Sequence, residues 1–325
     1  MKKEKTEYSY SVASGAVAIL NADASVPSPN DWEDEHPATG EKRKHKGGIV
    51  GKAGTFNIDS WSGDDLTLGV LYGKKKAEVT IASTAVNKKA VTVTEMVKDL
   101  NTAFTNLAAA GIKLKASKTD KGADYDDEYL KIIDNETQSA EKLPFFAPIG
   151  FKGRLAALLG ITGWVLTDEI KSAKGDFEKE SGKSVDATSG KGLRCTIKEA
   201  DKIKGININL SLSGIDDGLL SLMTGNTYNE KTGEMYFDNA GDPPLLAVRY
   251  FAQQYEGGEN QKGNFVKMKM VMYPSCRFSA PNEEAKESDF NAVEIQGSGG
   301  ENKRSNLPLK FTKTIVKSDY GKFVE

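Results

Sequence analysis

Alternation of apolar and polar residues is the clearest pattern in the chain, and it is strongest over residues 205–213. Ile206, Ile208 and Leu210 fall on one face of this segment, while asparagine and serine fall on the other. A period of two residues is expected of a strand that buries one face. The pattern therefore predicts a half-buried β-strand, the first of a series of strands that continues to residue 297.

A short helix is predicted directly after this strand. Asp216 is a good N-cap, and leucine and methionine side chains over residues 219–223 supply an apolar face. Gly225 can adopt the left-handed conformation that ends many helices. The spacing fits a helix of about two turns.

Two further strands are predicted to form a hairpin. Pro243 and Pro244 block helix and open a segment that alternates over residues 245–252, and glycines 257 and 258 suggest the turn. The returning strand, residues 265–273, places an apolar row opposite Lys267 and Lys269. That row consists of Val266, Met268, Met270 and Met272. Methionine surfaces can be adaptable binding patches, but strand alternation favours a core or a subunit interface.

The middle of the chain mixes helix and strand patterns. Residues 78–90 predict a short β-run, and Thr94 is predicted to cap a helix that stops at Gly111. Residues 112–117 and 128–133 predict two strands joined by an acidic turn, and residues 154–161 predict a short apolar helix that ends at Gly160. We therefore expect a small α+β unit in this region.

Segments rich in lysine, glycine and serine flank this unit, at residues 72–78 and 171–192, and predict linkers. Insertion at an exposed loop is tolerated because the cost of loop closure grows slowly with length. We expect a discontinuous β core, residues 1–75 and 185–325, interrupted by an inserted α+β domain with a flexible exit linker, residues 76–184.

Three of these segments together resemble the C-terminal half of major tail proteins of long-tailed bacteriophages. They are LLSLMTG at residues 219–225, PPLLAVRYFAQQYEGG at 243–258, and FVKMKMVMYPSCRFSAPNEEAKESDFNAVEI at 265–295. SYSVASGAVAIL, residues 9–20, is similar to the opening strand of that family. The resemblance implies a mainly β fold, an antiparallel β-sandwich or barrel-like core with one short packing helix. The α+β unit resembles add-on modules of tail sheath and flagellar filament proteins.

The resemblance also implies a function. Members of the family are structural subunits of the tail tube, and they assemble into stacked hexameric rings that form the conduit for genome delivery into the host. It implies as partners other copies of the chain, a tape measure protein, and tail tip or terminator proteins, with DNA passing transiently through the lumen. The expected location is the virion, in the phage tail, after assembly in the host cytoplasm.

Two regions take a specific meaning within such a tube. The polar segment 26–48 is either a solvated loop or a long loop that reaches the next ring. A lumen lined with Lys and Arg would retain DNA, so the lumen is expected to be neutral to acidic. The acidic residues considered for its lining are Asp216, Asp217, Glu256 and Asp289. Lys267 and Lys269 would need nearby carboxylates if their face points inward.

Composition fits a globular chain. The chain has 325 residues, 38% of them hydrophobic, and a formal net charge of −2, so a core can form without an obvious polyanion-binding character. Cys195 and Cys276 sit alone in strand-like runs, which predicts buried, reduced thiols rather than a disulfide or a metal site. No apolar run of about 18 residues and no basic-then-apolar leader is present, so neither membrane insertion nor a signal peptide is expected.

The sequence contains no complete pattern for catalysis by histidine or for binding of a phosphate or dinucleotide. The only two histidines, His36 and His45, lie in the polar segment without a placed nucleophile, and we expect surface histidines. SGKS at residues 181–184 lacks the first glycine of a phosphate-binding loop, because Phe177 stands there. Glycines 190 and 192 lack the third glycine of a dinucleotide fingerprint.

Two charged clusters have simpler readings. Asp124, Asp126, Asp127 and Glu128 could hold a hard cation such as calcium, but an acidic hairpin turn is the expected structure. Arg43 belongs to a basic run without interleaved aromatic residues, which favours a solvated face over a phosphate contact. No catalytic, cofactor-binding or metal-binding residue is therefore predicted, no cofactor is implied, and the chain is not expected to be an enzyme.

Two alternatives from other classes remain open. The first is an adhesin or receptor-binding module of a virion or cell surface, which would form a small closed oligomer and never a filament. The second is an enzyme with an unrecognised carboxylate site.

Overall fold

The computed structural model describes residues 7–36, 39–122, 125–135, 148–182, 184–189, 192–198, 200–214, 216–229, 232–236, 243–256, 264–281 and 293–316. Strands make up 51% and helices 15% of the structure, and the sheets are antiparallel. The mainly β fold is thereby confirmed, although the strands of the described residues do not close the large sheet into a barrel.

The largest sheet has eight strands, and it draws on both ends of the chain. In spatial order it contains β12 (Trp164–Thr167), β1 (Glu7–Ile19), β19 (Leu246–Glu256), β20 (Asn264–Phe278), β21 (Val293–Gly299), β16 (Lys202–Leu212) and β13 (Ile170–Glu180), with β22 (Phe311–Val316) paired to β20 outside this path. All of these pairs are antiparallel.

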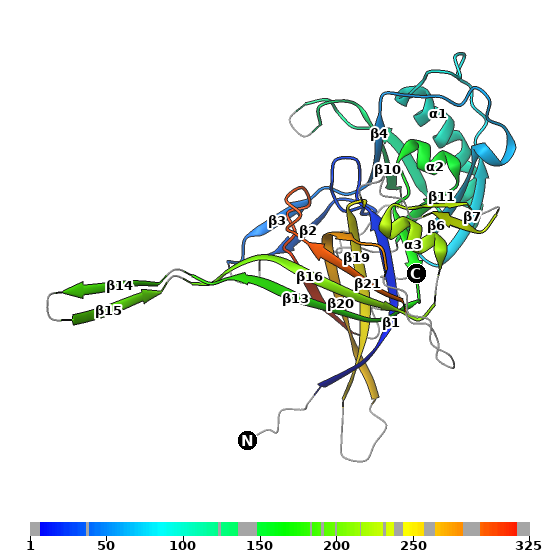
Figure 1. The fold of residues 1–325 in the computed structure, drawn as a ribbon. Coiled ribbons are helices and arrows are strands. Elements are labelled where there is room, and N and C mark those ends of the chain that lie inside the picture. Colours follow the sequence, from blue (N-terminus) through cyan, green and yellow to red (C-terminus); the bar gives the residue numbers. More distant parts are fainter. Residues whose placement is uncertain are drawn as a thin grey trace.

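The sheet divides at β20. The part of β20 from Lys267 to Met272 pairs with β22, whereas the part from Cys276 to Phe278 pairs with β21. Strands β16 and β13 then cross over β1 and β20, as Figure 1 shows, and the two layers enclose one apolar cluster. Ile208 and Leu210 of β16 are at most 1% exposed in it, which confirms the predicted alternation of that strand.

Helix α3 (Asp217–Thr224) also packs against this cluster and has the predicted caps. The Asp216 carboxylate accepts a hydrogen bond from the Leu219 amide at 3.0 Å, and Gly225 has φ = 77°. Leu219, Leu220 and Met223 are buried. Side-chain capping satisfies an amide that has no partner within the helix, so the boundary is set by local chemistry.

The predicted hairpin of β19 and β20 is present as an antiparallel pair, and β20 continues past Tyr273 to Phe278. Met268, Met270 and Met272 are at most 2% exposed, so the methionine row belongs to the core of the single chain. The turn at residues 257–258 and the acidic turn before β21 lie outside the described residues.

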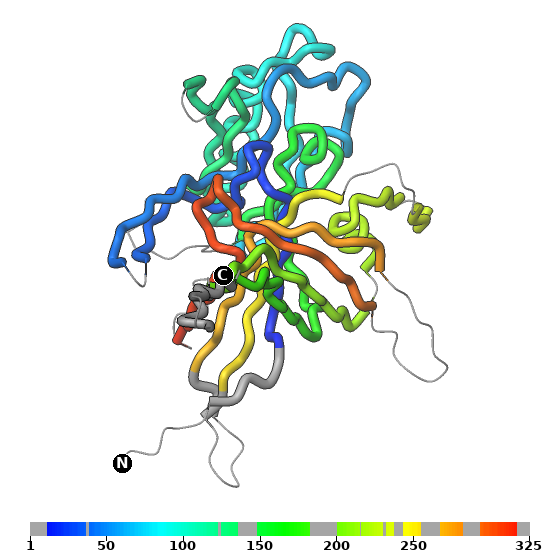
Figure 2. The backbone as a smooth tube through the Cα atoms, turned by 60° about the vertical axis from the view of Figure 1, so that its left-hand side comes forward, coloured from blue at the N-terminus to red at the C-terminus, as the bar shows by residue number. Residues whose placement is uncertain are grey.

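A second unit with its own apolar cluster lies at one end of the sandwich (Figure 2). Its elements are β4 (Ile49–Ala53), β5 (Thr55–Phe56), η1 (Gly63–Leu66), β6 (Thr67–Tyr72), β7 (Lys75–Thr80), β8 (Val91–Thr92), α1 (Val93–Phe104), η2 (Thr105–Ala110), β9 (Leu114–Lys118), β10 (Tyr129–Asp134), β11 (Ile149–Lys152) and α2 (Arg154–Leu159). The cluster runs from Ile49 to Ile161 and does not follow the predicted boundaries, 76 and 184. Strands β4 to β6 pair within this unit, whereas β12 and β13 pair within the large sheet.

Local predictions inside this unit hold in part. Strands β9 and β10 pair as expected, and α2 ends at Gly160, whose φ is 69°. The β-run is shorter than predicted, because β7 ends at Thr80. The cap of α1 is Thr92 and not Thr94: Thr92 and Glu95 form a reciprocal capping box, and Thr94 lies inside the helix.

Neither predicted linker is a linker. Residues 72–78 belong to the β6–β7 hairpin: Tyr72 ends β6, residues 73–74 form the tight turn, and residues 75–78 lie in β7, with Tyr72 opposite Lys75. Residues 171–192 form most of β13, which pairs with β16, and then β14 (Ser184–Ser189), which pairs with β15 (Gly192–Lys198). Figure 1 shows β14 and β15 extending well away from the sandwich. A short hairpin of β17 (Thr227–Asn229) and β18 (Glu234–Tyr236) follows α3.

The polar segment 26–48 contains a further hairpin, of β2 (Trp32–Glu35) and β3 (Lys42–His45). In Figure 2 this hairpin projects from the side of the molecule. Trp32 at its base is 7% exposed and packs with Leu307, so the segment is anchored and is not a purely solvated loop.

Candidate assembly surface and adjoining pocket

Strand β13 forms one border of the large sheet. It pairs with β16, and the described residues place no strand on its other side. Most of its side chains are exposed, and these include Phe177 at 44%. Ile203 of β16, near the same end of the pair, is 51% exposed. An open strand edge with exposed apolar residues is a site where another chain can add to a sheet.

The β13–β16 pair and the β14–β15 pair belong to one long hairpin. Ile170 lies opposite Leu212, Glu180 lies opposite Lys202, and Ser184 lies opposite Lys198. The first part of this hairpin packs on the sandwich, since Ile206 belongs to the core cluster and Ala173 packs against it. We name residues 177–204 the arm. Backbone pairing of β13 with β16 and of β14 with β15 runs along it.

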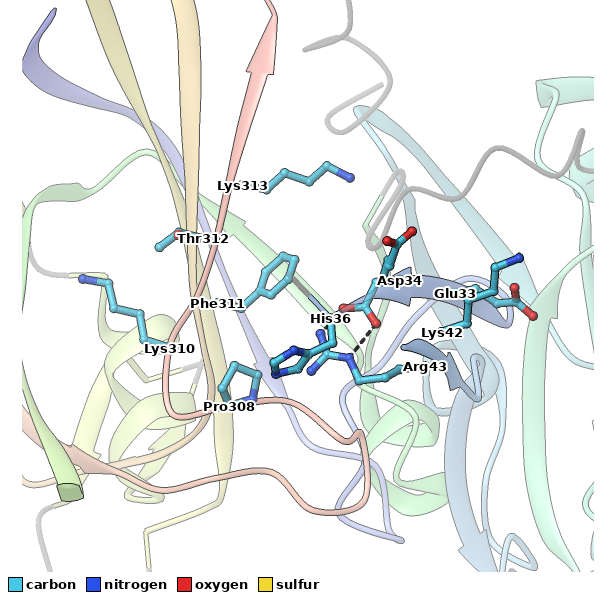
Figure 3. A pocket seen from close by; sticks show the side chains of 11 residues that line it. Glu33, Asp34, His36, Lys42, Arg43, Pro308, Lys310, Phe311, Thr312 and Lys313 are labelled. Carbon is cyan, nitrogen blue, oxygen red and sulfur yellow. Dashed lines mark hydrogen bonds and ion pairs between the residues drawn. The ribbon is translucent and has the colours of Figure 1, made fainter. Parts of the chain in front are cut away.

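A pocket of about 620 Å³ lies between β22 and the β2–β3 hairpin (Figure 3). Its walls come from Glu33, Asp34, Glu35, His36, Lys42 and Arg43 on the hairpin side, and from Pro308, Lys310, Phe311, Thr312 and Lys313 on the β22 side. In Figure 3 the Phe311 ring and the Lys313 side chain point from β22 toward the hairpin, while Lys310 points the other way.

The hairpin wall is held by one carboxylate. Asp34 accepts hydrogen bonds from both the Nε and the Nη2 atoms of Arg43, the first at 2.9 Å, and its Oδ1 lies 2.9 Å from Nε2 of His45. Burial by itself would raise the pKa of Asp34, but the hydrogen bonds from Arg43 and His45 outweigh it and hold that pKa below its ordinary value. Asp34 is therefore ionised and fully engaged at neutral pH.

His45 is buried, which corrects the expectation of a surface histidine. It is 4% exposed, its ring stacks on Trp32 with centroids 3.6 Å apart, and its Nδ1 donates to the Ser305 carbonyl at 2.6 Å. His36 does lie near the surface, in the wall of the pocket. The partner of His45 is 260 positions away along the chain, so sequence spacing carries no signal for this contact.

The opposite wall carries two lysines. Lys313 is partly buried, and no ion pair joins it to any described residue. Burial lowers the pKa of Lys313, although the negative charge of Asp34 opposes that effect. Lys310 lies over the Tyr273 ring at 5.8 Å, and burial and the neighbouring Lys269 lower its pKa.

The remaining candidates from the sequence, the acidic cluster at residues 124–128 and the segment 181–184, do not form binding sites among the described residues. Asp126 accepts from the Tyr129 hydroxyl at 2.8 Å, and Glu128 pairs with Lys118 at 2.7 Å. Asp124 lies outside the described residues, and within the described part of the chain no three potential ligands gather as a metal site. Residues 181–184 join two strands, which is not the strand–turn–helix setting of a phosphate loop.

Cys276 is buried, and its Sγ donates to the Leu246 carbonyl at 3.2 Å. Burial raises the pKa of this thiol and so disfavours the thiolate that a nucleophilic cysteine needs. The side chain of Cys195 lies outside the described part of the structure.

The expected lumen residues are only partly described. Asp216 caps α3 and Asp217 lies in its first turn, whereas Asp289 and the side chain of Glu256 lie outside the described residues, so the acidic lining stays a prediction. Lys269 is exposed on the face opposite the methionine row, as predicted, and its positive charge contributes to the lowered pKa of Lys310.

No protein-family model matches this chain, and no curated protein is similar to it at a significant level. Among the described residues, no helix is both long and apolar enough to cross a membrane.

Proposed function

We propose that the chain is a self-assembling structural subunit, the tail tube subunit of a long-tailed bacteriophage. The observation that carries the proposal is the open edge of β13, which continues into the arm; Phe177 of β13 and Ile203 of the neighbouring strand β16 are exposed there. An unpaired strand edge can pair with a strand of another chain. Assembly into a closed ring removes the edge by giving it a defined partner.

The chemistry of the described side chains favours a structural role over catalysis. The Asp34 carboxylate is saturated by Arg43 and His45, and the Cys276 thiol is buried and protonated. A general base needs a free lone pair near a substrate, and a nucleophile needs access to one. Neither group meets its requirement.

The finer features of the proposal come from the family resemblance. They are hexameric rings stacked into a tube, contacts with tape measure and tail tip or terminator proteins, passage of DNA through the lumen, and residence in the virion. Subunit interfaces should each bury more than about 1,000 Å².

Substitution of the exposed apolar residues of the arm tests the proposal. Phe177→Lys and Ile203→Lys should abolish concentration-dependent assembly, because each replaces an exposed apolar side chain by a charge and so removes apolar contact with a neighbouring copy. Both side chains lie largely outside the core, so the variants should remain folded. Val86→Lys is the matched control, since Val86 is fully exposed on the second unit and should be silent.

Sedimentation across a concentration series measures the outcome. If the parent assembles and the arm variants assemble equally well, then the arm is not the interface. If the parent sediments as a monomer at every concentration, then the structural role itself is wrong. A small closed oligomer without filaments would favour the adhesin or receptor-binding alternative.

A further inference from the structure

The buried ring of His45 has a hydrogen-bond acceptor at each of its two nitrogens. Nδ1 lies 2.6 Å from the carbonyl oxygen of Ser305, and Nε2 lies 2.9 Å from Oδ1 of Asp34. A carbonyl oxygen and an ionised carboxylate can only accept, so both ring nitrogens have to donate. Neutral imidazole carries one N–H, whereas imidazolium carries two. The geometry therefore fits the imidazolium form of His45.

The proton between His45 and Asp34 belongs to the ring. The carboxylate also accepts hydrogen bonds from Nε and Nη2 of Arg43, and these donors hold the pKa of Asp34 below its ordinary value. Protonation of Asp34 would weaken all of these charge-assisted contacts. The ring of His45 also stacks on Trp32, with centroids 3.6 Å apart, and the face of an indole attracts a cation.

Other charges around His45 come from the elements packed against it. Arg43 of β3 shares the Asp34 carboxylate, and Lys313 of β22 interacts with the same carboxylate. Both cations oppose a charge on His45, whereas Asp34 and the Ser305 carbonyl favour it and are in direct contact with the ring. Exposed cations adjoin His45 and Ser305 along the chain, where water weakens their effect: Lys44, Lys46, Lys303 and Arg304.

The bond to Ser305 joins the β2–β3 hairpin to a loop near the other end of the chain. We name this loop, residues 302–307, the clasp. The Oγ atom of Ser305 accepts a hydrogen bond from the Val26 amide at 2.6 Å. Leu307 packs into the apolar cluster at the base of the hairpin. The clasp and the hairpin therefore hold each other in place, with His45 at their junction.

We propose that His45 is a proton-dependent latch: as imidazolium it binds the clasp to the β2–β3 hairpin, and on losing its proton it releases the clasp. A neutral ring that accepts no proton from elsewhere can donate from one nitrogen only. An ionised carboxylate is a stronger acceptor than a carbonyl, so the remaining N–H stays on Asp34. The Ser305 carbonyl then faces a ring lone pair in place of a donor, which favours opening of the clasp.

The direction of the pH dependence follows from the number of bound protons. Below about pH 6.5, the ordinary value for histidine, His45 is protonated whether the clasp is closed or open, and the latch contributes in full. As the pH rises above that value, the open state loses its proton first, so the closed state becomes less stable relative to it. One proton changes this equilibrium by no more than about tenfold per pH unit.

Nuclear magnetic resonance of the imidazole nitrogens tests the protonation state in the full chain. The chain has two histidines, and His36 is the internal control. Its Nδ1 accepts a hydrogen bond from the Thr39 amide at 3.2 Å, which requires a neutral ring. At about pH 7.5 the spectra should show two protonated nitrogens in His45 and one in His36. A neutral His45 in the folded parent would overturn the proposal.

Hydrogen exchange of backbone amides tests the release of the clasp. Protection of the Val26 and Leu307 amides, corrected for the intrinsic rate at each pH, should fall above about pH 7, by up to about tenfold per unit. His36→Gln should behave as the parent does. His45→Gln cannot become charged and should give low protection that does not change with pH. Constant protection in the parent, or an unchanged pH dependence in His45→Gln, would overturn the latch.

Asp34→Asn provides a second variant in case His45→Gln does not fold. It removes the negative charge beside the ring, so His45 should lose its proton at a lower pH, and the fall in protection should move with it. A fall in protection that stays at the pH of the parent would contradict the role of His45. These measurements concern contacts within one chain, so this proposal and assembly through the arm can each fail alone.

Discussion

At the scale of single residues, the core of the sandwich depends on the absence of a side chain at position 175. A Cβ atom on Gly175 would lie 2.6 Å from the Tyr273 hydroxyl oxygen and 2.9 Å from Cδ1 of Ile206. Tyr273 is fully buried, so its ring has little room to move. Gly175 therefore lets β13 approach β20 closely.

We predict that Gly175→Val lowers the free energy of unfolding by about 1–3 kcal/mol, the usual cost of overpacking. Gly300→Val is the control, because a Cβ atom there meets nothing within 4 Å. Denaturant titration measures both. Adding Tyr273→Phe to Gly175→Val should restore part of the loss, because it removes the closest atom. Equal effects of the two glycine substitutions would contradict this explanation.

The Asp34 contacts predict a pH-dependent contribution to stability. The pKa of Asp34 is lower in the folded chain than its ordinary value of about 3.9. The stabilisation is therefore complete above that ordinary value and is lost as the pH falls through the lower, folded value. Asp34→Asn should destabilise the chain at neutral pH, and the difference from the parent should shrink below about pH 4. A difference that stays constant across thermal melts from pH 7 to pH 3 would contradict the role of the ionised carboxylate.

At the scale of elements, the helix α3 offers a direct test of its cap. Asp216→Ala should cost about 1 kcal/mol, because the Leu219 amide loses its acceptor. Asp217→Asn, one position further on, is the control, since no side-chain cap hydrogen bond involves Asp217. Urea unfolding monitored by circular dichroism compares them. If both variants match the parent, then packing of Leu219 and Leu220 alone defines the helix.

The elements that could be predicted from the sequence are those whose cause is local. Alternation identified β16 because one face is buried, and Asp216 and Gly225 marked α3 because caps act within a few residues. Over β13 the sequence predicts a linker, because most side chains of this strand are exposed and it therefore shows no apolar alternation. Its strand conformation comes from pairing with β16, which is a long-range cause. The buried position of His45 and the pocket beside β22 depend on segments some 260 residues or more apart, and no local pattern reveals them.

At the scale of the whole molecule, the two apolar clusters suggest that the second unit can be removed. Gly163 and Gly150 form an isolated bridge, and a Cβ atom on Gly163 would lie 2.8 Å from Cδ1 of Ile49. The chain therefore leaves and re-enters the sandwich at neighbouring points, which a short linker can join.

We predict that replacing residues 51–161 by a short Gly/Ser linker leaves a folded sandwich with a cooperative thermal transition. Replacing residues 76–184 instead should give an insoluble or unfolded chain, because it removes β12 and β13 from the large sheet and leaves β4 to β6 without their partners. If the second deletion folds and the first does not, then the division of the chain into these two clusters is wrong.

The central claim is that this chain is built to assemble through the open edge and arm of its large sheet. Electron microscopy of the purified parent chain, over a range of concentrations, tests it most directly. The account predicts rings or stacked tubes, with the β14–β15 end of each arm resting on a neighbouring copy. Separate, monomeric particles at every concentration, with the arm in contact with nothing, would contradict it.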